Sequence, residues 1–362
     1  MNVCVLVGNG FDLALGLKTG YRSFIAEYIN EHRESQGADI KWLCETIEKD
    51  LETWGDAEIA FGKLPFELAR KNPTETYMSC EEDFSVSFQK YLRRENKLFV
   101  VPEHEQESTR KLILRSLLEL PKWMTTGHRA KCRLVNPKDV SVDFINFNYT
   151  DTLKQIVGVD LPISQKIDSP LSEVTMHSVC HVHGTLDDGV LFGVDSPEQI
   201  VNQSVRGYCS RTGETIKPRG AEVAGYAARA AGVELLRAAD VIVTFGLSFG
   251  ASDKSWWQLL WERVFDGGRH SQLIVCPYSL QRPVEILGNR MVRNYALEKK
   301  RVFHSFAGVN EIASLEGTTA DRIIVLQPMQ DDQNPYDYFH LTELSHKYSS
   351  NVVLTSGGES HE

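Results

Sequence analysis

A short apolar run near the start of the chain restricts the fold most strongly. Residues 2–7 are almost continuously apolar, include three valines, and end at Gly8-Asn9-Gly10. A run that is apolar on both faces and bounded by glycines is typical of a buried parallel strand. Parallel strands need long crossover connections, which are usually helical, so an α/β architecture is expected.

A long stretch without strands follows this first one. Between about residues 38 and 130, apolar residues recur at helical spacing and no strand-like alternation interrupts them convincingly. A nucleotide-binding βαβ unit would normally show its second strand soon after its first helix. We therefore expect a Rossmann-like, mostly parallel sheet with helices on both faces and a large helical insertion after the first strand. The expected division is a discontinuous α/β nucleotide-binding domain at 1–37 and 135–348, a helical insertion at 38–134, and a C-terminal tail at 349–362.

The remaining elements alternate between strands and helices in the second half of the chain. Strands are expected at 142–149, 174–183, 190–193, 240–246, 271–276, 301–305 and 321–326, and helices at 220–239, 253–266 and 283–298.

Composition and charge narrow the function classes. Apolar residues make up 42% of the 362 residues and charged residues 24%, which is ordinary for a globular protein. The net charge of −10 argues against nucleic acid and against an anionic membrane surface, because both favour a basic surplus. No apolar run reaches the roughly 18 residues of a membrane span, and the first residues lack a signal peptide's cationic leader. The seven scattered cysteines form no Cys-x-x-Cys pair, so we expect a reducing, cytoplasmic setting.

The first motif that could carry chemistry is Gly8-Asn9-Gly10-Phe11-Asp12, directly after the first strand. Backbone N–H groups of such a turn can approach a phosphate, and a following helix N-terminus favours an anion. The strict dinucleotide fingerprint needs a third small residue, where this chain has Leu13. An ordinary strand-to-loop turn, with Asp12 as a local cap, stays open beside the phosphate-binding interpretation.

The second motif is Asn146-Phe147-Asn148-Tyr149-Thr150-Asp151. Asn146 and Asn148 make one face of the expected strand polar at its carboxyl end, where open α/β sheets bind ligands. Two amides inside an apolar strand are costly unless satisfied, which favours a ligand-holding or water-holding role for Asn148. The alternative is that Asn148 bonds its own turn and caps the following helix.

Three histidines, His177, His181 and His183, fall on one face of the third expected strand. A zinc site is disfavoured, because same-face neighbours lie roughly 6.6 Å apart along a strand. His183 precedes Gly184 at the strand end and is better interpreted as a general acid or base. We expect His177 and His181 to be structural or surface residues, and we expect no metal.

The fourth motif is Gly246-Leu247-Ser248-Phe249-Gly250, after another apolar strand. Its small residues allow close backbone approach to a ligand, and a hydroxyl can bond a phosphate or ribose oxygen. The motif also fits a Gly-x-Ser-x-Gly nucleophile elbow, so a Ser248 hydrolase is a further hypothesis. It is the weaker one, because Asp253 is too close to serve as the triad acid and His304 is a loose candidate for the base.

Three of these four motifs lie at the ends of expected strands, and we expect the turn at His183 to be a fourth. If the sheet is parallel, their carboxyl ends meet at one edge. This convergence predicts a single site more strongly than any of the motifs does alone.

Together these segments resemble the bacteriophage abortive-infection family called AbiH-like. The resemblance spans about residues 5–255 in the order that the family shows, and residues 256–362 add little to it. It implies a role in phage defence. The matching stretches are Leu6–Ala14, Gly16–Tyr21, Trp54-Gly55-Asp56-Ala57-Glu58, Phe147–Leu153, His183-Gly184, Phe192-Gly193-Val194-Asp195, Phe245-Gly246-Leu247-Ser248 and Asp253.

The layout is also similar, more remotely, to the sirtuin-like NAD-binding fold. In that fold a glycine-rich first turn binds the dinucleotide phosphates, an Asn matching Asn148 lies by the nicotinamide ribose, and a His matching His183 acts there. A Gly-x-Ser turn matching Gly246 and Ser248 touches the adenosine half. The zinc-binding cysteine quartet of the deacetylases is absent, so protein deacetylation is not expected. Phe11-Asp12 also departs from the sirtuin pattern.

The resulting hypothesis is a phage-defence effector that binds and hydrolyses NAD, or a related nucleotide, at the N-glycosidic bond. Asn148 would position a water and the nicotinamide, and His183 would polarise that water or a ribose hydroxyl. Glu58 and Asp12 would face the developing positive charge. NAD would be a substrate or ligand and not a prosthetic group. The expected ligand-binding residues are Gly8, Asn9, Gly10, Phe11, Thr150, Gly246, Ser248 and Asp253.

A second hypothesis is a non-catalytic nucleotide sensor or partner-binding module of a defence system that uses the same pocket. A phage-derived trigger, a defence-system partner and assembly into a homo-oligomer are general expectations for an effector that must stay silent in healthy cells.

Overall fold

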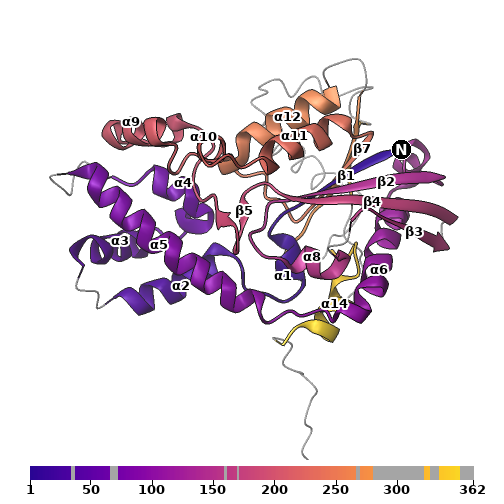
Figure 1. Cartoon of the computed structure of the whole chain (residues 1–362), viewed down its shortest axis with the longest axis horizontal. Coiled ribbons are helices and arrows are strands. Elements are labelled where there is room, and N and C mark those ends of the chain that lie inside the picture. The colour runs from indigo at the N-terminus through magenta and orange to yellow at the C-terminus, as the bar shows by residue number, and fades with distance from the viewer. Residues whose placement is uncertain are drawn as a thin grey trace, which may run out of the picture.

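A mostly parallel sheet of seven strands lies at the centre of the fold (Figure 1). The computed structural model describes residues 1–33, 37–65, 72–158, 161–168, 171–265, 270–279, 322–326 and 334–350. Neighbouring strands are parallel except β3, which is antiparallel to β4. The sheet order is β3-β4-β2-β1-β7-β8-β9, with β1 at Asn2–Val7, β2 at Asp139–Asn146, β3 at Ile163–Asp168, β4 at Leu171–His181, β7 at Val241–Phe245, β8 at Gln272–Cys276 and β9 at Ile323–Val325.

The order of the strands reverses its direction at β1. The chain adds β2 and β4 on one side of β1, and β7, β8 and β9 on the other. In open α/β sheets, ligands bind outside the carboxyl ends of the strands at such a reversal. Val7 is in register with Asn146 of β2 and with Phe245 of β7, so three of the sequence motifs leave the sheet at the same level.

Alternate side chains of the sheet enter two hydrophobic layers, as expected for strands buried on both faces. Val3, Val5 and Val7 pack with one set of helices, and Cys4 and Leu6 pack with another. The Rossmann-like arrangement with helices on both faces is therefore confirmed. The first layer contains α1 (Gly10–Ala14), α6 (Gln106–Glu119), α8 (Thr152–Val157) and α14 (Leu341–Tyr348), and the second contains α11 (Ala228–Ala238) and α12 (Lys254–Phe265).

The large helical insertion after the first strand is confirmed too. Its helices form a lobe beside the sheet around an aromatic cluster, in which the Phe84 ring contacts Phe24, Trp54 and Phe61 at centroid distances of 5.0, 5.7 and 4.8 Å (Figure 1). Residues 99–134 pack instead into the first sheet layer. The lobe contains α2 (Tyr21–His32), α3 (Ala38–Lys49), η1 (Thr53–Asp56), α4 (Ala57–Gly62) and α5 (Pro73–Asn96), joined by α9 (Gln203–Thr212).

The shorter elements connect these layers. They are η3 (Glu103–Glu105), η4 (Leu120–Trp123), α7 (Thr126–Lys131), the β5–β6 hairpin (Gly184–Thr185 and Gly189–Val190), η5 (Pro197–Gln199), α10 (Lys217–Val223) and η6 (Ala251–Asp253).

Several boundaries differ from the sequence expectations. The helix expected at 220–239 is two helices, α10 and α11, separated by a turn in which Gly225 has φ of +64°. The strand expected at 142–149 begins earlier and ends at Asn146, and the one expected at 190–193 is reduced to the end of a short hairpin. Edge strand β3 and helices α9 and α14 were not predicted. The elements expected at 283–298 and 301–305, and residues 351–362 of the tail, lie outside the described residues.

Candidate functional site

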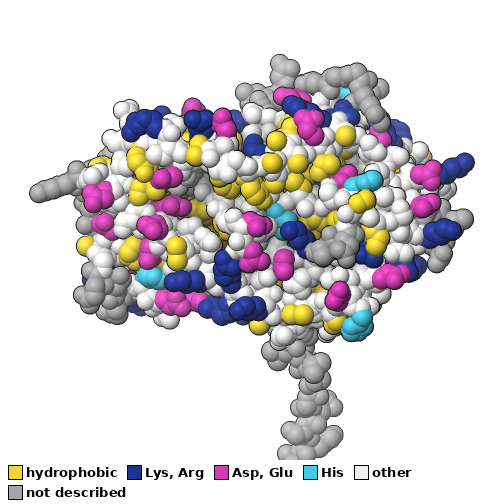
Figure 2. All heavy atoms as spheres, in the orientation of Figure 1, with side chains coloured by type: hydrophobic (Ala, Val, Ile, Leu, Met, Phe, Trp, Pro, Cys, Tyr) yellow, Lys and Arg dark blue, Asp and Glu magenta, His cyan; other side chains and the backbone are white. Residues whose placement is uncertain are grey.

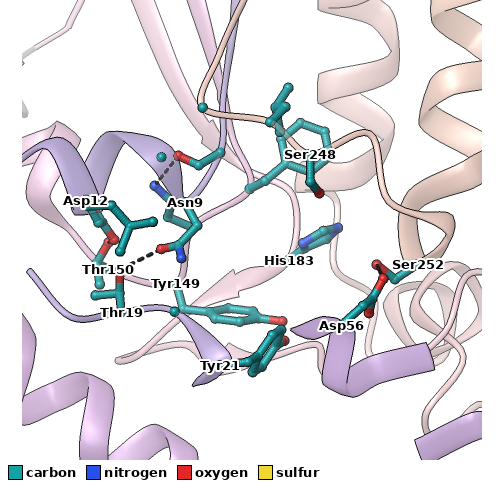
Figure 3. A pocket seen from close by; sticks show the side chains of 18 of the residues that line it. Asn9, Asp12, Thr19, Tyr21, Asp56, Tyr149, Thr150, His183, Ser248 and Ser252 are labelled. Carbon is teal, nitrogen blue, oxygen red and sulfur yellow. Dashed lines mark hydrogen bonds between the residues drawn. The ribbon is translucent and has the colours of Figure 1, made fainter. Parts of the chain in front are cut away.

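A cavity of about 580 Å³ lies at the carboxyl edge of the sheet, bounded by the helical lobe on its other side. Residues from the ends of β1, β2, β4, β7 and β8 line it, together with residues from α2, η1, α4 and α5. In Figure 3, Asn9, Asp12, Thr19 and Thr150 gather at one end, His183, Asp56 and Ser252 gather at the other, and Tyr21 and Tyr149 lie between them. The lining includes the predicted residues Gly8, Asn9, Gly10, Asp12, Glu58, Asn148, Thr150, His183, Gly246, Ser248 and Asp253.

Phe11 is the predicted site residue that does not line the cavity. Its side chain is buried in the first sheet layer, with its ring edge-on to Phe245 at 6.2 Å. In a helix that begins at Gly10, Asp12 lines the cavity while its neighbour Phe11 enters the core. Phe11 therefore anchors α1, and its side chain points into the core and not into the cavity.

The two glycine turns pack directly against each other. The Gly8 N–H donates to the Phe245 carbonyl at 2.9 Å, the Gly10 N–H donates to the Gly246 carbonyl at 3.0 Å, and the Phe11 N–H donates to the Gly8 carbonyl at 2.9 Å. These donors are therefore not available to hold phosphates, contrary to the sequence expectation. Glycine is needed at these positions because the two backbones touch.

Asn148 connects β2 to the first turn. Its Nδ2 donates to the Gly8 carbonyl at 3.2 Å, and its own N–H donates to Asn146 Oδ1 at 3.0 Å. His181 Nδ1 lies 3.1 Å from the Asn148 carbonyl, and since a carbonyl only accepts, that nitrogen carries a proton. Burial lowers the pKa of His181 to about 4, so its ring is neutral at neutral pH. His181 is thus a buried structural residue, and His177 is exposed.

The chemical centre of the cavity is a chain of buried ionisable groups. His183 Nε2 lies 3.0 Å from Asp253 Oδ1, Lys217 Nζ lies 2.8 Å from the same oxygen, and Lys217 Nζ also lies 2.9 Å from Glu58 Oε2. Burial lowers the pKa of His183 although Asp253 opposes the shift, so the imidazole is neutral at neutral pH. Asp253 Oδ1 is thus shared between His183 Nε2 and Lys217 Nζ, and both His183 Nε2 and Asp253 Oδ1 are shielded from solvent.

Glu58 is fixed by groups from three parts of the fold. Besides Lys217, its carboxylate accepts hydrogen bonds from the Tyr149 hydroxyl at 3.2 Å and from the Gly193 N–H at 3.4 Å. Burial raises the pKa of Glu58 to about 7, against the opposing effect of Lys217. Asp253 behaves oppositely, because Lys217 and His183 outweigh its burial and lower its pKa. Two carboxyl groups in one cavity thus differ widely in acidity, as acid–base sites require.

Lys217 is one of the site residues that sequence reasoning missed, as is Arg22. Lys217 is 3% exposed and begins α10, which follows the Ile216 bridge to Val194. A single lysine between Ile216 and Pro218 belongs to no motif. Only the folded structure indicates its role, because it brings together two buried carboxylates, Glu58 and Asp253, that require a cation between them.

Asp12 lies at the other end of the cavity and is 1% exposed. It accepts hydrogen bonds from the hydroxyls of Thr150 at 2.7 Å and Thr152 at 2.6 Å. Burial raises the pKa of Asp12 to about 6, although both hydroxyls oppose the shift. The predicted residues Asp12 and Thr150 are therefore brought together, and Asp12 connects α1 to the β2 loop.

Ser248 does not have the geometry of a nucleophile elbow. In that motif the serine itself occupies the strained turn, whereas here positive φ angles fall on Gly246 (+66°) and Phe249 (+55°). No histidine among the described residues bonds the Ser248 hydroxyl. His304 lies outside the described residues.

The cavity lining is acidic. Asp12, Asp56, Glu58 and Asp253 contribute carboxyl groups, while Arg22 is the one permanent cation among the described lining residues. Arg22 stands in the first turn of α2, whose N-terminal residues also line the cavity and carry the positive end of the helix dipole. Figure 2 shows acidic and basic side chains mixed over the face that it presents. An anionic group is therefore best held beside Arg22.

Three general features complete the description. Among the described residues, no group of three or more His, Cys, Asp or Glu side chains is arranged to hold a metal ion. None of the helices in the described ranges has the length and apolar character needed to cross a bilayer. All seven cysteines lie in described segments, where they are buried and form no disulfide.

Comparison with known protein families identifies the family of this chain. The family model for bacteriophage abortive infection AbiH matches residues 4–269, a range that holds every part of the acidic and histidine network described above. No curated protein matches the chain. Because the family model covers most of the chain, including the cavity edge of the sheet from β1 to η6, this protein belongs to the bacteriophage abortive infection AbiH family.

Proposed function

We propose that this protein carries out its role in abortive infection, the phage-defence role that its family indicates, by hydrolysing the N-glycosidic bond of NAD⁺ or a related nucleotide. The observation that supports this most is the buried chain from His183 through Asp253 and Lys217 to Glu58, which opens into one cavity. In this chain His183 is a neutral base, Asp253 is a permanent anion, and Glu58 is a carboxyl group that ionises near neutral pH.

In the proposed reaction, His183 activates the attacking water. The water oxygen forms the new bond to the ribose carbon, and its proton passes to Nδ1 of the neutral imidazole, whose Nε2 faces Asp253. Asp253, 3.0 Å from Nε2, stabilises the imidazolium that forms, in the way that the acid of a catalytic triad does. The pair of electrons from the broken C–N bond goes to the nicotinamide ring nitrogen, so nicotinamide leaves as a neutral molecule.

The acidic lining suits the transition state of this reaction. Glycosidic cleavage passes through an oxocarbenium-like state whose positive charge a nearby carboxylate stabilises. Glu58 in its ionised form is the proposed anion, and Asp56 lies in the same wall. Asn148, whose Nδ2 bonds the Gly8 carbonyl, would orient the ribose by holding the two neighbouring turns in place.

The pyrophosphate would lie at Arg22 and the N-terminus of α2. This placement replaces the Gly8 and Gly10 amides of the sequence hypothesis, because the Gly8 N–H bonds strand β7 and the Gly10 N–H bonds the turn after it. An arginine and a helix N-terminus together are an ordinary phosphate site.

The decisive experiment is to incubate purified full-length protein with NAD⁺, with and without extract of phage-infected cells, and to follow nicotinamide release. We expect release in at least one condition. His183→Ala should abolish release while NAD⁺ binding persists. His177→Ala is the matched control, since it removes an exposed histidine from β4 and should leave release unchanged.

The same experiment separates the second candidate function. Binding of NAD⁺ without nicotinamide release under every condition would replace hydrolysis by a sensing role. A sensor would also keep its ligand response in His183→Ala, whereas an enzyme would lose turnover.

A further inference from the structure

Lys217 connects the helical lobe to the turn that follows β7 of the sheet. Glu58 belongs to α4 in the helical lobe, whereas Asp253 follows β7 of the sheet. The Lys217 ammonium lies within 3 Å of both, at 2.9 Å from Glu58 and 2.8 Å from Asp253. Among the described residues, the ion pairs of these two carboxylates involve Lys217 and His183 alone.

The lysine itself is held firmly by the main chain. Its N–H donates to the Val194 carbonyl at 2.9 Å, and the Val194 N–H donates to the Thr215 carbonyl at 2.8 Å. The adjoining Gly193 N–H bonds Glu58 at 3.4 Å. The two paired segments around Val194 and Ile216 pack in the cluster of the lobe and present two donors to Glu58, while the ion pair of Lys217 with Asp253 joins this group to the turn after β7.

The charges around Glu58 do not balance without Lys217. Two carboxyl groups face Glu58, those of Asp56 from the same segment and Asp253 from η6. Two tyrosines also interact with it, Tyr149 from the β2 loop and Tyr21 from α2. His183 pairs with Asp253 and not with Glu58 itself. Two carboxylates opposite a single lysine cannot both be compensated fully. The pKa shifts agree, because that of Asp253 is lowered while that of Glu58 is raised to about 7.

We infer that Lys217 is a positioning residue that clamps the helical lobe to the sheet through its ion pairs with Glu58 and Asp253, and that its positive charge offsets the two carboxylates. The role of ionised Glu58 in turnover rests on the proposed function, but the electrostatic role of Lys217 does not. Removing the lysine leaves Glu58 facing Asp253 and Asp56 without a cation, which disfavours its charged form.

The test is a carboxyl ¹³C NMR titration of the full chain labelled at glutamate, with the Glu58 signal assigned by its loss in Glu58→Gln. We expect a wild-type midpoint of about 7. Lys217→Met should raise this midpoint by about one pH unit or more, a tenfold change in the acid dissociation constant. Lys217→Arg should keep it near the wild-type value, because the positive charge remains. Lys111→Met, which breaks an exposed pair with Glu107, is the matched control and should not move it.

Lys217→Met also leaves the buried Asp253 carboxylate without its lysine, which can prevent folding. A second pair of variants, both carrying Asp253→Asn, removes that problem. The comparison is therefore repeated with Asp253→Asn against Lys217→Met/Asp253→Asn, where the midpoint should again rise when the lysine is lost. An unchanged Glu58 midpoint in either background overturns the inference, as does an equal shift in Lys217→Arg. If the midpoints shift as expected but wild-type protein releases no nicotinamide, the proposed hydrolysis fails and the role of Lys217 stands.

Discussion

Gly10 and Gly246 come from turns more than 200 residues apart in sequence, and their backbones are in direct contact. A β-carbon on Gly10 would lie 2.4 Å from Gly246 Cα, and one on Gly246 would lie 2.6 Å from Gly10 Cα. The Gly10 N–H also donates to the Gly246 carbonyl at 3.0 Å. The contact joins the turn after β1 to the turn after β7, the two neighbouring strands at which the strand order reverses. It therefore fixes the edge of the cavity at this point.

We predict that Gly10→Ala destabilises the protein by roughly 1–3 kcal/mol, because the added methyl group meets backbone that cannot rotate away. Gly246→Ala should cost more, since its φ of +66° also disfavours a side chain. Urea unfolding measures both. Gly127→Ala in helix α7 is the control, because a methyl group added there would have no neighbour within 4 Å and alanine favours a helix. Equal stability of Gly10→Ala and wild type would contradict the contact.

Arg22 supplies a prediction about ligand charge. If pyrophosphate lies beside this guanidinium, Arg22→Ala should weaken NAD⁺ binding by about tenfold to a hundredfold, the range of a hydrogen bond to a charged group. Nicotinamide riboside, which lacks the pyrophosphate, should bind about equally to both proteins. Calorimetric titration measures these affinities. Arg33→Ala, at the far end of α2 and paired with exposed Glu48, is the matched control. An equal loss for both ligands would mean that Arg22 has a structural role.

Ser248 gives a prediction that separates the hydrolase hypothesis from the others. Its turn carries the positive φ angles on Gly246 and Phe249, and no described histidine bonds its hydroxyl. A fluorophosphonate probe should therefore leave folded protein unlabelled. Ser248→Ala should also retain nicotinamide release within a few-fold of wild type. Stoichiometric labelling that disappears in Ser248→Ala would restore the hydrolase hypothesis.

The sequence was sufficient to predict that the motifs converge at the carboxyl edge of the sheet. Each motif follows an apolar strand, and the parallel register of Val7 with Asn146 and Phe245 places three of their ends at one level. Strand ends and glycines are local signals, so they can be recognised without knowing the fold. The insertion was recognisable for a related reason, because helical periodicity replaces the expected second strand over a long range.

Other features depend on tertiary contacts that leave no local pattern. Lys217 is an isolated lysine in sequence, and its importance arises from carboxylates 159 residues before it and 36 residues after it (217 − 58 and 253 − 217). The burial of the Phe11 side chain was not predicted, because motif membership does not say which face of a helix turns to the core. Edge strand β3 has exposed or half-exposed residues over most of its length, so its hydrophobic alternation is weak.

The last prediction concerns stability and pH at Asp12. Burial raises its pKa from 3.8 to about 6, so the folded state holds this proton more tightly than the unfolded state does. The tighter binding of the proton stabilises the folded state fully below about pH 4. This contribution to the free energy of unfolding, roughly 3 kcal/mol in total, is lost as the pH rises through about 6. Asp12→Asn removes this dependence, because one of the two threonine hydroxyls can still donate to the amide oxygen while the other accepts from the amide nitrogen. In urea unfolding, the stability of Asp12→Asn relative to wild type should therefore rise by most of that free energy between pH 4 and pH 8.

Glu107→Gln is the control. The hydrogen bond from Lys111 lowers the pKa of the exposed Glu107 carboxyl, so the stability of Glu107→Gln relative to wild type should not rise with pH. A pH-independent difference between Asp12→Asn and wild type would show that Asp12 is ionised in the fold throughout this range.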